Sequence, residues 1–270
     1  KKNLNLLKAF NGTAYFKSDD LEIKFGEINL DQNTFITTAK DNVKILDLKK
    51  NILIESNLII FEKKKGVLRS SVLSKLKDEM NNKISSENFN FNLNDGILKL
   101  QNVKLEDFND NFFEIDAAYL NTETNELVGK DISINLNNKS FNEDNEPRLK
   151  GKSISYANGL TEITKGVFTT CKKRDKCPPW QLSAEKIQHD SRKKTISYKN
   201  AILRVYDLPV MYFPKFFHPD PTVKRQSGFL IPELSSSNNL GNYLSVPYFK
   251  VISENKDLTF TPRFYDKEKI

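Results

Sequence analysis

Apolar and polar residues alternate with a period of two over most of the chain between Leu21 and Tyr156. The segment 21–25, for example, reads Leu-Glu-Ile-Lys-Phe. Successive side chains of a β-strand point to opposite faces, so each such segment has one apolar face and one mixed face. Strands that are buried on one face only belong to antiparallel sheets. The pattern therefore predicts an all-β protein.

Turn residues recur between these segments. Asn, Asp and Gly tolerate left-handed and tight-turn conformations, and one strand with one turn per repeat predicts stacked antiparallel hairpins. Residues 72–83 fit either a short helix or a hairpin, and the turn spacing favours the hairpin. The predicted turns are Asp41-Asn42, Asn81-Asn82, Asp95-Gly96, Asn109-Asp110, Asn125-Glu126, Asn137-Asn138 and Asn158-Gly159.

Composition helps to choose between two all-β architectures. A closed β-sandwich and an open β-jellyroll both explain the alternation. Hydrophobic residues make up 38% of the 270 residues, which is a low share for a chain of this length. The low share favours the open β-jellyroll, whose apolar inner face is not fully closed.

Charge and motifs argue against several classes of protein. The formal net charge is +7, but 42 basic residues are interspersed with 35 acidic ones. The densest basic groups, at 63–65, 172–174 and 192–194, lie where turns are expected, so we predict solvated turns and no nucleic-acid partner. The sequence has no Gly-rich phosphate loop, nucleophile elbow, HExxH motif or paired carboxylates. We therefore predict no enzyme, no cofactor and no metal site, because two cysteines without a nearby His make only half a zinc site.

The character of the sequence changes near Leu208. Proline and aromatic residues become frequent over 206–225, and proline cannot donate to the ladder of a central strand. Residues 206–225 are therefore predicted to form a rigid linker between residues 1–205 and residues 226–270.

Three segments after this linker read as antiparallel strands. They are 228–232, 243–249 and 258–265, they have the length of membrane-spanning β-strands, and Tyr and Phe cluster at their ends. They are either soluble hairpins or the first strands of a β-barrel that continues past Ile270, because an open sheet edge is not viable in lipid. The chain has no initiator Met or signal peptide, so we expect a mature or trimmed piece of a longer protein.

The passage over about 166–265 carries a family resemblance. Together, its motifs resemble the LptD family of lipopolysaccharide-assembly outer-membrane proteins, also called the organic solvent tolerance (OstA) family. Residues 1–165 resemble the periplasmic jellyroll of that family only in pattern. The segments that carry the resemblance are Thr170-Cys171, the Trp180 strand, Ile187-Gln188-His189-Asp190, Asn200–Val205, Leu208–Pro214, Arg225–Pro232 and Pro247-Tyr248-Phe249.

The resemblance implies a two-part lipopolysaccharide transporter. Residues 1–205 are then an open β-jellyroll in the periplasm, and residues 226–270 are the first strands of a transmembrane β-barrel in the outer membrane. The jellyroll would receive lipopolysaccharide from a periplasmic bridge protein, LptA or an equivalent. The barrel, plugged by the lipoprotein LptE, would release it sideways through a lateral gate into the outer leaflet.

The resemblance also implies roles for particular residues. Pro232 and Pro247 match prolines of the first barrel strands, where a missing N–H would weaken the lateral gate. Cys171 matches a jellyroll-end cysteine that the family bonds to distal barrel cysteines. Cys177 departs from the usual pattern, so the disulfide is either a local Cys171–Cys177 bridge or a bond from one or both cysteines to others outside this sequence.

For an open jellyroll, the apolar strand faces would form a path for acyl chains, because burying apolar surface is favourable by roughly 25 cal/mol per Å². A structural or adhesive β-repeat protein that binds partner proteins at the cell surface is the alternative, and a secreted carbohydrate-active β-domain is a third. The candidate lipid-binding residues are Ile52, Ile54, Leu58, Ile60, Phe113, Ile115, Tyr119, Ile132 and Ile134.

Overall fold

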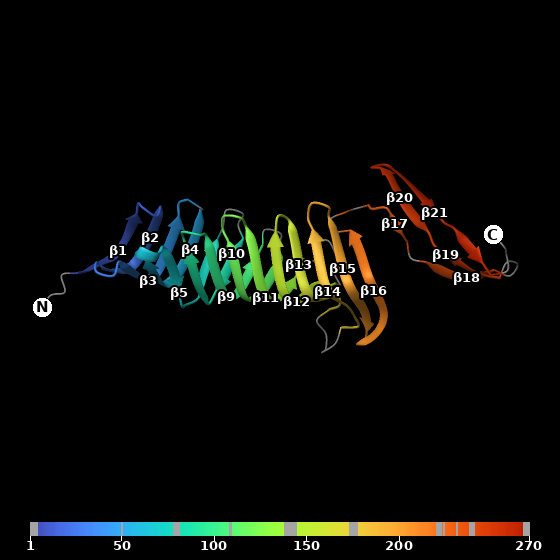
Figure 1. Cartoon of the computed structure of the whole chain (residues 1–270), viewed down its shortest axis with the longest axis horizontal. Helices are drawn as coiled ribbons and strands as arrows, with labels where there is room; N and C mark the ends of the chain where they lie inside the picture. The colour runs from blue at the N-terminus through green and yellow to red at the C-terminus, as the bar shows by residue number, and fades with distance from the viewer. Residues whose placement is uncertain are drawn as a thin grey trace. The chain divides into compact units, whose positions relative to one another are not determined.

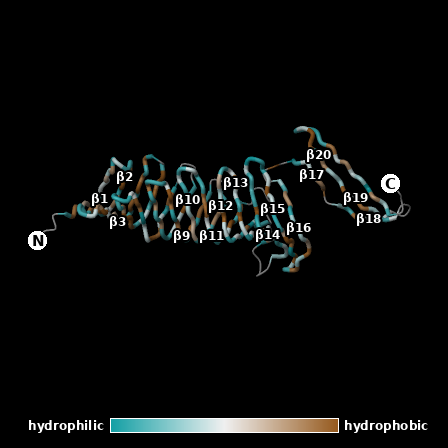
Figure 2. Tube along the Cα trace, in the orientation of Figure 1, coloured by the Kyte–Doolittle hydropathy of each residue, from teal (hydrophilic) through white to brown (hydrophobic). Residues whose placement is uncertain are grey.

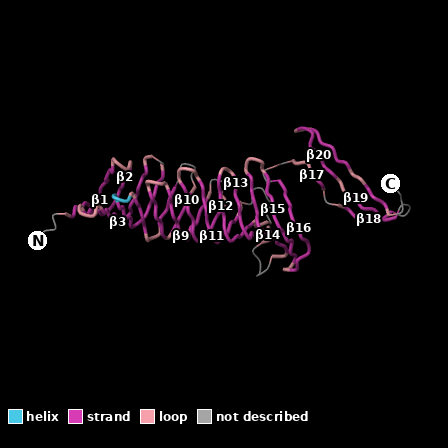
Figure 3. The backbone as a smooth tube through the Cα atoms, in the orientation of Figure 1, coloured by secondary structure: helices cyan, strands magenta, loops and turns pink. Residues whose placement is uncertain are grey.

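The computed structural model describes residues 5–49, 51–77, 82–107, 110–137, 145–172, 178–219, 223, 225–230, 232–237 and 241–266. These residues form β-strands, turns and one short 3-10 helix, η1 (Lys63–Lys65), which is cyan in Figure 3. The chain divides into two compact units, unit 1 (Lys1–His218) and unit 2 (Pro219–Ile270). Each unit is described by itself.

Unit 1 is a single antiparallel sheet in which most strands lie side by side in chain order (Figure 1). The exception is that β5 is followed by β8, while the β6–β7 hairpin pairs with β4 and β9. Among the described strands β1 and β16 each have one neighbour, so the sheet stays open at both ends. The prediction of an all-β, jellyroll-like antiparallel fold is confirmed. The strands are β1 (Leu6–Phe16), β2 (Leu21–Asp31), β3 (Ile36–Asp47), β4 (Ile52–Glu62), β5 (Val67–Ser70), β6 (Ser74–Lys77), β7 (Lys83–Ser86), β8 (Asn88–Asn92), β9 (Ile97–Glu106), β10 (Phe112–Asn121), β11 (Glu126–Asn135), β12 (Arg148–Ala157), β13 (Leu160–Thr169), β14 (Trp180–Asp190), β15 (Thr195–Val205) and β16 (Leu208–Pro219).

The long strands bend near their middles, and both halves face one core. In β2, for example, Ile23 and Ile28 are both buried in the same cluster although strict alternation would put them on opposite faces. A strand can keep both halves on the core only if it turns a corner. Figure 2 shows the hydrophobic and hydrophilic positions interleaved along these bent strands.

Several of these corners fall on residues with positive φ. Asn and Asp enter the left-handed region more readily than most residues because their short side chains bond locally. Before such a residue every second side chain points inward, and after it the alternate set of side chains does. A corner residue therefore shifts the inward-facing positions by one residue. Mid-strand residues with positive φ are Asn11, Asp41, Asn42, Asn102, Asp131, Lys165 and Asn200.

The predicted hairpin at 72–83 is confirmed, because β6 pairs antiparallel with β7. The turns at Asp95-Gly96, Asn125-Glu126 and Asn158-Gly159 also connect strands as predicted. Asp41-Asn42 does not: it lies inside β3 at a corner, where the pairing with β4 shifts register. The turns at Asn81-Asn82, Asn109-Asp110 and Asn137-Asn138 include residues outside the described part.

The predicted linker 206–225 is wrong over most of its length. Leu208–Pro219 forms β16, the last strand of the unit 1 sheet, and the boundary between the units follows His218. Proline is compatible with this position because an edge strand has one side on which no N–H is needed. The proline-rich sequence therefore marks a sheet edge.

Unit 2 contains two three-stranded antiparallel sheets, with strand orders β17-β20-β21 and β18-β19-β22. The second and third predicted strands are each interrupted, so that their two parts lie in different sheets, whereas the first, 228–232, contains β17 and ends just before β18. The second, for instance, divides into β19 and β20 at Val246-Pro247. The elements are β17 (Gly228–Phe229), β18 (Glu233–Ser237), β19 (Gly241–Ser245), β20 (Tyr248–Ser253), β21 (Lys256–Phe260) and β22 (Arg263–Tyr265).

Candidate functional site: an apolar interior and a proline line

The interior of unit 1 is a continuous apolar cluster that extends from β2 to β15. Six of the nine predicted lipid-binding residues belong to it. Four are buried, and the other two are partly buried and pack against the cluster. The buried residues are Ile54, Ile115, Ile132 and Ile134, and the partly buried ones are Ile52 and Phe113.

The other three predicted residues, Leu58, Ile60 and Tyr119, do not belong to this cluster. Beyond Ser56 the inward positions of β4 are Ile59 and Phe61, each 1% exposed. The bend in β4 shifts the inner face by one residue, which puts Leu58 and Ile60 on the other face.

Tyr119 is displaced from the interior for the same reason. In β10 the inward position after the bend is Ala118, and the side chain of Tyr119 is 52% exposed. The Lys99 ammonium lies 5.5 Å from the centre of the Tyr119 ring. Strict alternation through a bent strand therefore placed one predicted contact on the wrong face.

Parts of the interior are tightly packed. A Cβ atom added to Gly151 would lie 2.3 Å from Cγ2 of Ile163, and one added to Gly166 would lie 2.4 Å from Cδ1 of Ile187. Both distances are well below a van der Waals contact, so an alanine at either position would force the facing isoleucine side chain to move. The two glycines allow neighbouring isoleucines to fill the interior.

A polar pair lies among aromatic rings at the β16 side of unit 1. The Tyr198 hydroxyl is 3.0 Å from Nε2 of His218, and the two rings are stacked with centroids 5.5 Å apart. Phe213 and Phe216 pack beside them. Burial raises the pKa of Tyr198 above its usual range, so the phenol stays neutral. Sequence reasoning missed this pair, although the aromatic residues near His218 gave a signal.

Of the two cysteines in the predicted disulfide, the structure describes only Cys171. Cys171 has a free thiol and is partly buried, with Sγ 3.8 Å from the carbonyl oxygen of Trp180. Trp180 packs edge-on against Phe168, as expected for a core anchor. Cys177 lies outside the described residues, so the disulfide stays a prediction.

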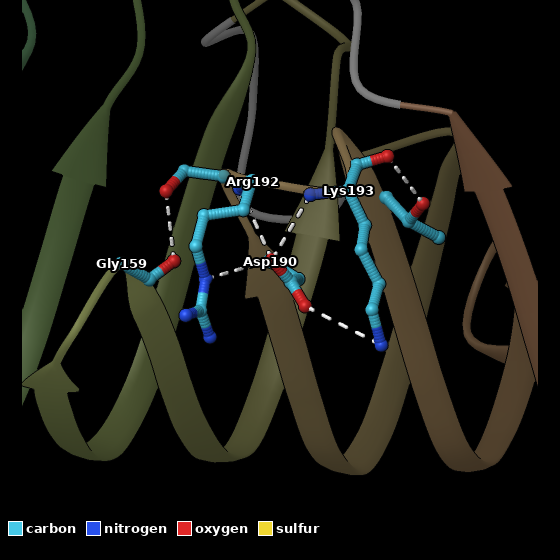
Figure 4. A network of polar contacts seen from close by, with 6 residues as sticks. Gly159, Asp190, Arg192 and Lys193 are labelled. Atoms are coloured by element: carbon cyan, nitrogen blue, oxygen red, sulfur yellow. Dashed lines mark hydrogen bonds and ion pairs between the residues drawn. The ribbon is translucent and has the colours of Figure 1, made fainter.

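The turn between β14 and β15 is organised by Asp190 (Figure 4). Its Oδ1 accepts hydrogen bonds from the backbone N–H groups of Lys193 and Arg192, each at 3.1 Å. These bonds, with Lys193 contributing most, hold the pKa of Asp190 below its usual value against the opposing effect of burial. Ser191 donates a bond of 2.8 Å to the carbonyl oxygen of Gly159 in the adjacent turn. The basic group 192–194 thus lies in an ordered turn.

Three prolines lie on one line across unit 2. Pro232 separates β17 from β18, Pro247 separates β19 from β20, and Pro262 separates β21 from β22. This proline line (Pro232, Pro247 and Pro262) divides three strands into two sheets. Sequence reasoning found the first two prolines and missed Pro262, although it holds the same place in the third predicted strand.

The hydrogen bonds across the line show what the prolines remove. The N–H of Leu230 donates to the carbonyl of Pro247 at 2.8 Å, and that of Val246 donates to the carbonyl of Pro262 at 3.2 Å. In an antiparallel ladder such partners exchange two bonds. Proline has no N–H, so the return bonds from Pro247 and Pro262 cannot form.

Unit 2 also has two apolar rows on its surface. On one side of the proline line the register aligns Phe229, Tyr248 and Phe260. On the other side it aligns Leu234, Leu244 and Phe264. Leu234 is 82% exposed and Phe229 74% exposed. In the third strand, Thr259 and Arg263 are polar neighbours of Phe260 and Phe264, so apolar and polar positions alternate there.

Comparison with known proteins finds similarity to one family. The model of the family described as LptD protein matches residues 196–270, from β15 through unit 2. Over 159 residues the chain is 36% identical to the LPS-assembly protein LptD of Shewanella frigidimarina, and over 150 residues it is 33% identical to that of Nitrosococcus oceani. The chain is thus similar to LptD proteins over residues 196–270 and over the aligned parts of these relatives.

The alignments cover only part of each LptD. They include 58% and 55% of this chain but 20% and 19% of these two relatives. The LPS-assembly protein LptD of Legionella pneumophila is 36% identical over 112 residues, which are 42% of this chain and 13% of that relative. The match thus spans about a fifth or less of the length of these LptD proteins.

The LptD family model includes several elements described above. Its matched range contains Tyr198 and β16 in unit 1, and the whole proline line in unit 2. Among the described residues, no helix has the length and apolar character to cross a membrane.

Proposed function

We propose that this chain is part of an outer-membrane lipopolysaccharide translocon. Unit 1 is a periplasmic jellyroll that binds the acyl chains of lipopolysaccharide, and unit 2 begins the membrane-embedded sheet that releases it. One observation carries this proposal: an open sheet with a continuous apolar interior is followed, in the same chain, by two small sheets with exposed apolar rows. Exposed apolar faces of this kind suit strands that contact lipid.

The acyl-chain path would run along the interior of unit 1. The interior side chains are packed against one another and exclude water. Acyl chains that enter would therefore replace contacts between these side chains. The open ends at β1 and β16 support entry and exit along the stack of strands. The interior residues Ile54, Ile115, Ile132 and Ile134 are the core of this path, with Ile52 and Phe113 at its margin.

A crosslinking pair on β10 tests this path. A photo-crosslinking amino acid at Phe113, which packs against the interior, should crosslink lipopolysaccharide in cells. The same group at Tyr119, on the outer face of the same strand, should give several-fold less product because burial of acyl chains favours the interior. Crosslinked lipopolysaccharide on immunoblots of the full-length protein gives the yield. Equal yields at both positions, or a higher yield at Tyr119, would contradict an interior path.

The bridge protein is proposed to bind the edge of β1. This strand pairs only with β2 among the described strands, and most of its side chains are exposed. A free strand edge presents unpaired N–H and C=O groups that can pair with another strand. The partner would be LptA or an equivalent that ends in a complementary strand. The plug lipoprotein LptE would bind the completed barrel, and no residue of either unit is assigned to it.

The proline line is proposed to weaken a lateral gate. In lipid, an unmade backbone hydrogen bond costs several kcal/mol, so a sheet that lacks such bonds separates more easily. Pro247 and Pro262 each remove one bond at the line between the two three-stranded sheets. Pro232 lies in the first strand of unit 2, beside a one-residue register shift between Phe229–Tyr248 and Glu233–Ser245. The line therefore allows the two sheets of unit 2 to move separately.

A further inference from the structure

The first strand of unit 2 has little backbone pairing before the proline line. β17 has two residues, which pair as Gly228 with Phe249 and Phe229 with Tyr248. One further bond joins Leu230 to Pro247. Each backbone hydrogen bond contributes only about 1 kcal/mol net. A ladder this short therefore needs additional contacts to keep β17 paired with β20.

Side chains just before β17 supply these contacts. The Arg225 guanidinium donates through Nη1 to the carbonyl oxygen of Glu254 at 2.7 Å. Through Nη2 it bonds the carboxylate of Asp257. Glu254 lies in the connection between β20 and β21, and Asp257 is the second residue of β21. The planar, forked guanidinium can bond both at once, which the single ammonium of lysine does less well.

Two more contacts act in the same direction. The Arg225 guanidinium carbon lies 5.9 Å from the centre of the Phe249 ring, within the range of a cation–π contact. The N–H of Val251 donates to Oγ of Ser227 at 2.9 Å. Residues 225–227 are therefore attached to β20 and to the turn that follows it, beyond the end of the β17 ladder.

We propose that Arg225 is a positioning residue that clamps the start of the first gate strand to the β20–β21 turn. The clamp acts on the sheet β17-β20-β21, whereas β18-β19-β22 lies on the other side of the proline line. Opening at the line would then move the second sheet and leave the first in register. The role in opening rests on the proposed lateral gate, but the clamp itself is a property of unit 2.

Hydrogen exchange of the full-length protein, followed by mass spectrometry, tests the clamp. Arg225→Ala should speed exchange about tenfold in peptides that cover 226–230 and 248–253, because a charge-assisted contact is lost. Peptides that cover 233–237 and 241–245 should exchange as in the wild type. Arg225→Lys should give an intermediate change. Arg263→Ala, which removes an arginine in the other sheet, is the matched control and should leave 226–230 unchanged.

A charge exchange separates the clamp from general destabilisation. Arg225→Asp combined with Asp257→Arg should restore slow exchange in 226–230, whereas Arg225→Asp alone should not. Unchanged exchange in Arg225→Ala, equal acceleration in both sheets, or no rescue by the double variant would overturn the clamp. Local acceleration with normal lipopolysaccharide at the cell surface would support the clamp and contradict the proposed role in gating.

Discussion

Replacing Pro247 and Pro262 together by alanine should lower lipopolysaccharide export by about thirtyfold. Each alanine regains an N–H opposite a residue that already donates to it, namely Leu230 or Val246. Two backbone bonds at about 1 kcal/mol each stabilise the closed sheet by about 2 kcal/mol, and 1.4 kcal/mol corresponds to tenfold. Surface lipopolysaccharide, measured in cells that express only the full-length variant, gives the result.

The single variants and a control sharpen this experiment. Pro232→Ala should also reduce export, because it restores a donor in the first strand of unit 2. Pro209→Ala is the control: Pro209 lies in β16 of unit 1 and is exposed, so export should not change. Full export by the Pro247→Ala and Pro262→Ala double variant, in a protein assembled at normal levels, would rule out a gate that depends on missing bonds.

The elements of this fold were predictable where local chemistry decides them. Asp95-Gly96 and Asn158-Gly159 are turns because their glycines have positive φ, at 69° and 76°. The alternation gave the all-β class because one face of each strand packs on the core. These features depend on a few neighbouring residues and need no knowledge of tertiary contacts.

The bends were not predictable in the same way. Asn102, Asp131 and Asn200 have the residue types and the positive φ of turn residues, yet each lies inside a long strand. Local sequence cannot say whether such a residue reverses the chain or turns it round the core. The choice depends on packing between sequence-distant strands, and it decides the face of every later residue in the strand.

In the candidate site, too, some features follow from local sequence and others depend on tertiary contacts. Pro232 and Pro247 could be chosen because a missing N–H has a local meaning. The alignment of Pro262 with them depends on the register of three strands. The Arg225 clamp joins residues about thirty positions apart through a turn, so no local pattern indicates it.

Phe61→Ala should destabilise unit 1 by about 3–5 kcal/mol, the usual effect of truncating a buried phenylalanine. Phe61 is 1% exposed and packs edge-on against Phe16, with ring centroids 5.2 Å apart. Truncation would leave a cavity between β1 and β4 as well as remove the aromatic contact. Urea unfolding of the chain, followed by far-ultraviolet circular dichroism, would show the loss as a lower midpoint.

Ile60→Ala is the matched control, because the bend in β4 turns Ile60 away from the cluster that holds Phe61. A partly exposed residue outside the core should cost about 1 kcal/mol or less when truncated. Strict alternation from Ile52 through Ile60 predicts the reverse order, with Ile60 inside and Phe61 outside. A larger loss for Ile60→Ala than for Phe61→Ala would therefore contradict the bent strand and restore Leu58 and Ile60 to the proposed acyl-chain path.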